Sequence, residues 1–187
     1  MKRNSILIIL LSILLVFGML GLAACAGKAD QEKPAKDDTN EPVPAEQSYQ
    51  VMLYFANEEY LATGDESLEK FKPYEQEVTA EPEKVYLATL ELLRTAPEEG
   101  FGTVLGESIQ FNDVYTEGDT AFVDLNSKGL SGGSLEETFL ISQIVNTILN
   151  SFDEVKQVQF LVDGQTAETL MGHVGTADPF TKDLFAE

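Results

Sequence analysis

Side chains that could carry chemistry are few and scattered in this sequence. His173 is the only histidine, so a metal site built from several histidines is excluded. It could line a groove or titrate near neutral pH, and it could equally cap a loop. Asp124 lies in an apolar stretch and could form one half of a catalytic carboxylate pair. Asp163-Gly164 resembles the opening of a calcium loop, and Gly132-Gly133-Ser134 could bind an anion ahead of a helix.

Each of these residues also has an ordinary structural explanation. Asp-Gly is a common dipeptide in the turns of β-hairpins, and the rest of a calcium motif is absent from the sequence. Among 32 acidic residues, chance pairs with Asp124 are plentiful. Glu136 and Glu137 already place negative charge at the start of the helix, which favours capping over anion binding. We therefore predict that the protein is not an enzyme and has no cofactor and no metal.

The charge balance narrows the choice of partners. The 187 residues contain 12 Lys and Arg against 32 Asp and Glu, a net charge of −20. Removal of residues 1–24 takes away Lys2 and Arg3, so that net charge of −20 becomes −22. Such a chain lacks the cations that nucleic acids and anionic membrane surfaces require. The single Cys excludes an intrachain disulfide and a zinc site built from cysteines.

The N-terminus predicts export and a lipid anchor. Residues 1–24 contain a basic start, an apolar run and small residues, the order of a secretory signal peptide. A membrane-spanning helix is the alternative, but Leu22-Ala23-Ala24-Cys25 resembles the bacterial lipobox. That resemblance implies diacylglyceryl modification of Cys25 and anchoring at the extracytoplasmic face of the cell membrane.

Two further regions follow the signal segment. Residues 25–48 contain the Cys, three prolines and many charged side chains, and they predict a disordered tether. Residues 49–187 predict one α+β domain, a two-layer βαββαβ sandwich with two helices on one face of a mixed sheet. Its expected strands are 49–55, 74–79, 108–115, 120–126 and 155–162, and its expected helices are 81–95 and 134–152. The acidic stretch 57–72 is expected to be irregular.

The second predicted helix has an unusual outward face. Its six residues carry no charge, although the rest of the domain is strongly acidic: Ser142, Gln143, Asn146, Thr147, Asn150 and Ser151. Ser, Asn and Thr are poorer helix formers than the Glu and Lys usual on solvated faces. Two explanations remain open, burial against another part of the domain, such as 57–72, or contact with a partner. These residues are the candidate interaction face.

Several segments together resemble a known domain family. They are 122–126 (FVDLN), the Gly-Gly-Ser before the helix, 143–148 (QIVNTI), 158–164 (VQFLVDG) and 170–173 (LMGH). In this order they resemble GerMN domains, named after a sporulation and germination lipoprotein of endospore-forming bacteria. The resemblance covers roughly residues 49–180 and implies a fold similar to ring-building motifs of secretion systems, with no catalytic residues. The sporulation protein has two such domains in tandem, and this chain has room for one.

The sequence thus predicts a non-catalytic lipoprotein on the extracytoplasmic face of the membrane. It would act as an interaction or assembly module in the cell envelope, with a role in sporulation or germination implied by the resemblance. Its partners would be the membrane, through Cys25, and an envelope protein or a second copy. The alternative is a lipoprotein that binds a small ligand or the cell wall, for which aromatic residues such as Tyr54, Phe55 and Tyr115 would line a groove.

Overall fold

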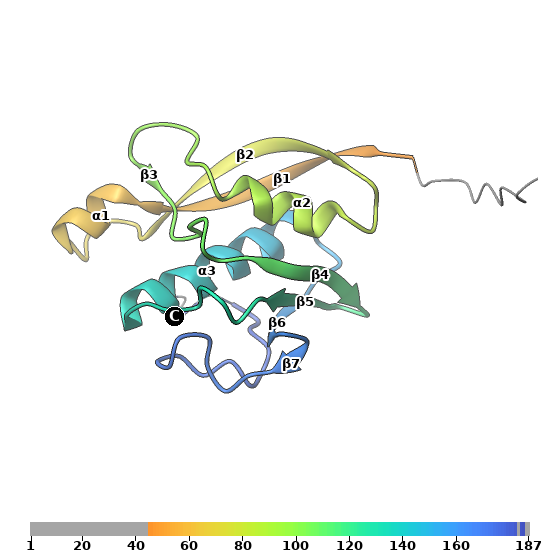
Figure 1. Cartoon of the computed structure of the whole chain (residues 1–187). Helices are drawn as coiled ribbons and strands as arrows, with labels where there is room; N and C mark the ends of the chain where they lie inside the picture. Colours follow the sequence, from red (N-terminus) through yellow and green to blue (C-terminus); the bar gives the residue numbers. More distant parts are fainter. Residues whose placement is uncertain (1–44, 183, 186–187) are drawn as a thin grey trace, which may run out of the picture. The chain divides into compact units, whose positions relative to one another are not determined.

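The computed structural model describes residues 45–182, 184 and 185 (Figure 1). Residues 1–24, Cys25 and most of the expected tether lie outside this range, so the predicted division into segments 1–24, 25–48 and 49–187 stays a prediction. None of the helices formed by the described residues is long and apolar enough to cross a bilayer.

The strands form two sheets. One sheet is antiparallel with the order β2-β1-β3, and the other has the order β4-β5-β6-β7 with β5 and β6 parallel. Their bounds are Gln47–Asn57 for β1, Phe71–Ala80 for β2, Phe101–Gly102 for β3, Phe111–Glu117 for β4, Thr120–Leu125 for β5, Gln157–Val162 for β6 and Gln165–Thr166 for β7. Along β1, Val51, Leu53 and Phe55 point into the core and are at most 2% exposed.

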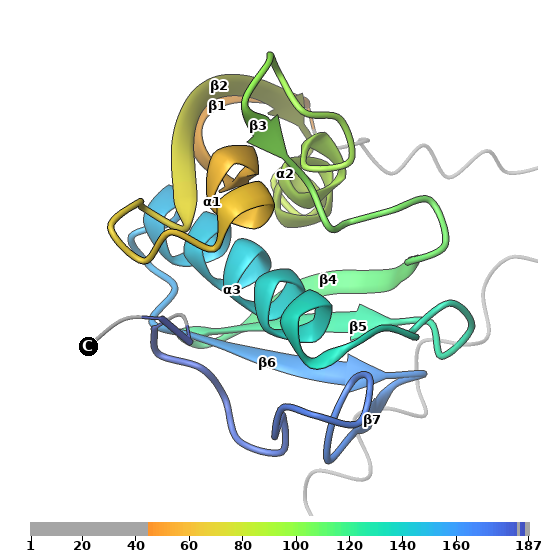
Figure 2. The same cartoon turned by 90° about the vertical axis from the view of Figure 1, so that its left-hand side faces the viewer.

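Three helices complete the domain: α1 (Glu58–Thr63), α2 (Val85–Leu92) and α3 (Ser134–Ser151). Helix α3 lies between the two sheets, with β1 and β2 on one side and β6 on the other (Figures 1 and 2). Its apolar side chains recur at helical spacing and are completely buried at Ile141, Ile144, Val145 and Ile148. The position of α3 therefore makes it the centre of the fold.

The structure confirms the α+β class and departs from the expected single sheet. Strand β1 pairs with β2 from Gln47 to Ala56, and β3 and α3 cover part of its other edge, so β1 does not join the β4–β7 sheet. The acidic stretch also differs from the expected irregular segment. Asn57 caps a short helix, α1, by accepting a hydrogen bond from the Glu59 N–H, and Gly64 ends it in the left-handed conformation.

Candidate interaction site

The polar side of α3 lies against the edge of β1 that faces away from β2. The Thr147 hydroxyl accepts a hydrogen bond from the Tyr54 N–H at 3.0 Å. The Ser151 hydroxyl accepts one from the Met52 N–H at 3.0 Å and donates one to the Met52 carbonyl at 3.2 Å. Four residues of helix rise about 6 Å and two residues of strand about 6.6 Å. Hydroxyls one turn apart on α3 therefore match alternate residues of β1.

Two more residues of the predicted face are also used inside the domain. The Gln143 amide accepts from the Val104 N–H at 3.2 Å and donates to the Thr103 hydroxyl at 3.3 Å. The Ser142 hydroxyl accepts from the Leu184 N–H at 3.2 Å. Of the two explanations left open for this face, contact with a partner does not apply to Ser142, Gln143 and Thr147, which are 0% exposed. Burial within the domain holds instead, against β1 and the segments at 103–104 and 184 rather than against 57–72.

The remaining two residues of that face reach the surface at different places. Asn146 is half-buried and lines a hollow beside Lys70, while Asn150 is exposed and lines a groove at the end of α3. Cys25, the predicted lipid-attachment residue, lies outside the described residues.

The groove next to Asn150 lies beside Tyr49 and Gln50 of β1 and has a volume of about 580 Å³. It is lined by β1, by the start of α2 and by the end of α3, with these residues: Tyr49, Gln50, Pro82, Val85, Tyr86, Asn150, Ser151, Phe152, Asp153 and Glu154. The rings of Tyr86 and Phe152 form its apolar part, with centroids 4.5 Å apart. The volume is within the usual range of ligand pockets.

Backbone groups of β1 are open along this groove. Met52 and Tyr54 direct their N–H groups away from β2, so Ser48 and Gln50 do the same, because strand geometry has a period of two. The hydroxyls of α3 accept hydrogen bonds from the N–H groups of Met52 and Tyr54, and α3 ends at Ser151. Within the described part of the chain, no backbone partner lies on this edge beside Ser48 or Gln50. Half of the β1 edge is thus protected and half is open.

The open half lies in an acidic setting. Asp153 and Glu154 are exposed at the end of α3, and the last turn of that helix has no basic residue. None of the ion pairs between described residues involves either acid. Lys156 lies close by and donates to the Asp153 backbone carbonyl, not to its carboxylate. Burial, and then the hydrogen bond to Glu154 at 2.9 Å, raise the pKa of Tyr86.

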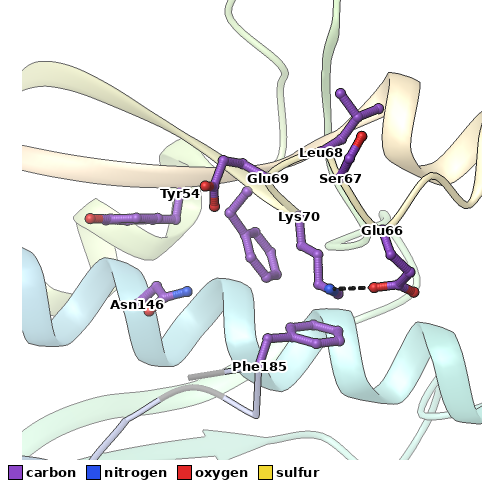
Figure 3. A pocket seen from close by; sticks show the side chains of 9 residues that line it. Tyr54, Glu66, Ser67, Leu68, Glu69, Lys70, Asn146 and Phe185 are labelled. Carbon is purple, nitrogen blue, oxygen red and sulfur yellow. Dashed lines mark hydrogen bonds and ion pairs between the residues drawn. The ribbon is translucent and has the colours of Figure 1, made fainter. Parts of the chain in front are cut away.

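A second hollow, of about 400 Å³, lies beside α3 around Lys70 (Figure 3). The Lys70 ammonium binds Glu66 at 2.9 Å and lies 5.1 and 5.2 Å from the ring centroids of Tyr60 and Phe185. The hydrogen bond between Lys70 and Glu66 raises the pKa of the lysine and lowers that of the acid. Because the cation is engaged within the domain, an anionic ligand would have to displace Glu66.

A buried carboxylate that sequence reasoning missed holds the C-terminal loop in place. Glu137 is 0% exposed and accepts four backbone hydrogen bonds. Its Oε1 takes the N–H groups of Leu170 and Met171 at 2.9 and 2.8 Å, and its Oε2 takes those of His173 and Val174 at 2.8 and 3.2 Å. The predicted Ser134/Glu137 capping box does not form: the N-cap is Gly133, which has no side chain, and its N–H donates to Glu136 Oε2 at 2.9 Å. Glu137 is therefore free to bind the LMGH segment.

The other residues with chemical potential are spread over the domain. His173 is exposed with Nε2 3.3 Å from the Gly132 carbonyl, and Asp124 accepts from the Gly164 N–H at 2.9 Å. Asp163 accepts from the Ser127 N–H, and the hydrogen bonding from Ser127 lowers the pKa of this carboxyl. The described residues contain no group of three or more His, Cys, Asp or Glu placed to hold a metal.

The three aromatic residues considered for a ligand groove do not converge. Phe55 is in the core at 1% exposure, and Tyr54 lines the hollow beside Lys70. Tyr115 stacks on Phe122 with ring centroids 5.2 Å apart and lines a separate hollow near Lys84.

Known proteins share this architecture. Residues 52–168 match the family described as "Germane: Sporulation and spore germination". The first GerMN domain of the sporulation protein GerM from Bacillus subtilis is 18% identical, with a TM-score of 0.53 over 72% of this chain and 96% of that one. The tandem GerMN domains of the same protein are 18% identical, with a TM-score of 0.49 over 81% of this chain and 48% of that one. A candidate lipoprotein from Clostridium perfringens is 19% identical, with a TM-score of 0.49 over 72% of this chain and 88% of that one. No curated protein matches the chain.

The fold is therefore that of a GerMN domain, as the sequence segments had predicted. The chain belongs to the Germane family of sporulation and spore germination, because the family match covers more than half of its length.

Proposed function

We propose that this protein is a lipid-anchored, non-catalytic assembly module on the extracytoplasmic face of the cell membrane. Cys25 would carry the lipid, and the GerMN domain would bind an envelope protein in sporulation or germination. The lipobox-like sequence before Cys25 supports the anchor, and the family supports the process.

The observation that carries the proposal is the half-open edge of β1. Exposed strand edges are templates for pairing with another chain, and folded proteins usually cover or charge them. Here α3 covers the edge at Met52 and Tyr54, yet the described residues supply no backbone partner on that edge to Ser48 and Gln50, and Gln50 lines a groove with an apolar part. Addition of a strand to such an edge is a recurring way to bind a protein segment.

The chemistry of the acids supports a non-catalytic role. Asp65, Glu66 and Asp163 have pKa values below the ordinary value, each through hydrogen bonds from neighbours. A carboxyl group that acts as a general acid at neutral pH needs a raised pKa. The buried Glu137 has both oxygens occupied by backbone donors.

In-cell crosslinking tests the assembly role. A photo-crosslinking amino acid at Asn150, in the groove, should capture an envelope protein, whereas the same group at exposed Glu107, outside the groove, should not. Equal labelling at both positions, or none at Asn150 under sporulating and vegetative conditions, would contradict the proposed interface.

The anchor has its own test. Cys25→Ser should abolish acyl labelling and leave the signal segment 1–24 uncleaved, since the thiol is the site of attachment and its modification precedes processing. Normal acyl labelling of the Cys25→Ser variant would refute the anchor and leave the crosslinking result unaffected.

A further inference from the structure

We propose that the occupant of the β1 groove is a basic, extended segment of a partner protein, which adds to β1 as an extra strand. This inference rests on the proposed assembly function and specifies the chemistry of the partner at the same site.

The hydrogen-bonding groups define the length and register of the added strand. Ser48 and Gln50 direct both N–H and C=O away from β2, which gives a template over 47–50 of about 13 Å. The Ser151 hydroxyl occupies both backbone groups of Met52, so the added strand must stop there. The end of α3 therefore acts as a barrier that fixes where pairing ends.

Side-chain space is available beside the template. Tyr49, Val85, Tyr86 and Phe152 supply the apolar part of the groove, and its volume of about 580 Å³ accommodates side chains from one face of a strand. Alternate side chains of the partner would enter this space, and the others would face solvent.

Charge selects a basic occupant over a second copy. Asp153 and Glu154 form one rim, and the C-terminal end of α3 adds partial negative charge with no cation in its last turn. A second copy would bring the same acids to the contact, and residues 49–187 contain seven basic against 26 acidic side chains. Like charges at an interface disfavour association. The chain's own preceding residues are also unsuitable in sequence, because Pro42 and Pro44 lack N–H donors and Glu41 and Glu46 are acidic.

Peptide binding to the full chain in detergent micelles tests the proposal. The probe is an eight-residue peptide of alternating Lys and Thr, compared with a Glu-Thr peptide and with a Lys-Thr peptide N-methylated at alternate residues. We expect the Lys-Thr peptide to bind, with NMR shifts at the amides of Ser48 and Gln50, and both comparison peptides to bind at least about tenfold more weakly, because they lack the charge or the backbone donors. No binding of the Lys-Thr peptide, or equal binding of all three, would overturn the proposal.

Variants of the protein test the same backbone hydrogen bonds between β1 and the added strand. Gln50→Pro removes an outward-facing N–H without touching the pairing with β2, and Gln50→Ala is its matched control, since both lose the side-chain hydrogen bond to Glu77. Gln50→Pro should weaken binding about fivefold to tenfold and Gln50→Ala less than about twofold. Equal effects of the two variants would exclude strand addition. If Gln50→Pro does not fold, the N-methylated peptide on the unchanged protein decides.

Charge and self-association complete the test. Asp153→Asn with Glu154→Gln should weaken Lys-Thr binding and reduce its salt dependence, and an unchanged affinity would refute the acidic rim as the selector. Dimers that form without peptide and disappear in Gln50→Pro would show that the occupant is a second copy. Capture of a partner at Asn150 in cells without Lys-Thr binding would refute only the basic strand, whereas binding without capture would refute only the assembly function.

Discussion

Replacement of Glu137 by Gln should strongly destabilise the domain. The carboxylate accepts four backbone N–H groups with no exposure to solvent. Gln keeps the size, but its amide nitrogen would face two of these donors, so two charge-assisted hydrogen bonds are lost. Such bonds contribute about 1.5–3 kcal/mol each, and we expect a loss of about 3–5 kcal/mol in the free energy of unfolding. That is a large part of the roughly 5–15 kcal/mol typical of a domain.

Urea unfolding followed by circular dichroism measures this loss, and Glu136→Gln is the control. Glu136 lies next to Glu137 on the same helix, is exposed and caps the Gly133 N–H, a role that Gln also fills. The control should change stability by less than about 0.5 kcal/mol. Amide exchange at Leu170, Met171, His173 and Val174 should also accelerate in Glu137→Gln. A loss no larger than that of the control, with exchange unchanged, would refute the anchoring role.

Three further changes test other parts of the fold. Thr147→Val should cost about 1–3 kcal/mol, because the part-buried Tyr54 amide of β1 loses its acceptor, while Thr138→Val should cost less in the same urea assay, because the Thr138 hydroxyl only donates to the Ser134 carbonyl of its own helix. Gly129→Ala should unfold the domain more readily than Gly172→Ala, which should cost about 1–2 kcal/mol. Both positions have positive φ, but only at 129 would a Cβ lie 2.1 Å from a backbone oxygen. Asp163→Asn should make the domain lose less stability in acid. The Asp163 carboxyl has a lowered pKa in the folded domain, so it stabilises the fold above its ordinary pKa of 3.8. This contribution is lost as the pH falls through the pKa of the folded state. Parallel profiles of the urea midpoint against pH for Asp163→Asn and the unchanged protein would contradict this prediction.

Local patterns predicted much of the fold. The i, i+3, i+4 spacing from Ile141 to Phe152 predicted α3, and Glu117-Gly118-Asp119 predicted the β4–β5 turn, where Gly118 has a φ of 64°. These features depend on neighbours in the chain, and the structure confirms them.

Long-range pairings were not predictable in the same way. The uncharged strip on α3 indicated that the helix face had a special role, but its hydrogen-bond partners on β1 lie 93 and 99 residues earlier. Glu137 at the start of a helix has the pattern of a capping or dipole-favoured acid, so nothing local indicates its bonds to residues 170–174. The open groove likewise depends on where α3 ends relative to β1, which no single segment encodes.

The hydroxyl contacts between α3 and β1 also bear on the order of events during the proposed export, as the chain emerges across the membrane from its N-terminal end. Strand β1 can pair with β2 as soon as residue 80 has emerged, whereas Thr147 and Ser151 follow roughly 70 residues later. Until then the nascent hairpin presents its entire second edge, including Met52 and Tyr54. Chains that stall before α3 would therefore be prone to aggregate through β1, whereas completed chains expose only the half beside the groove.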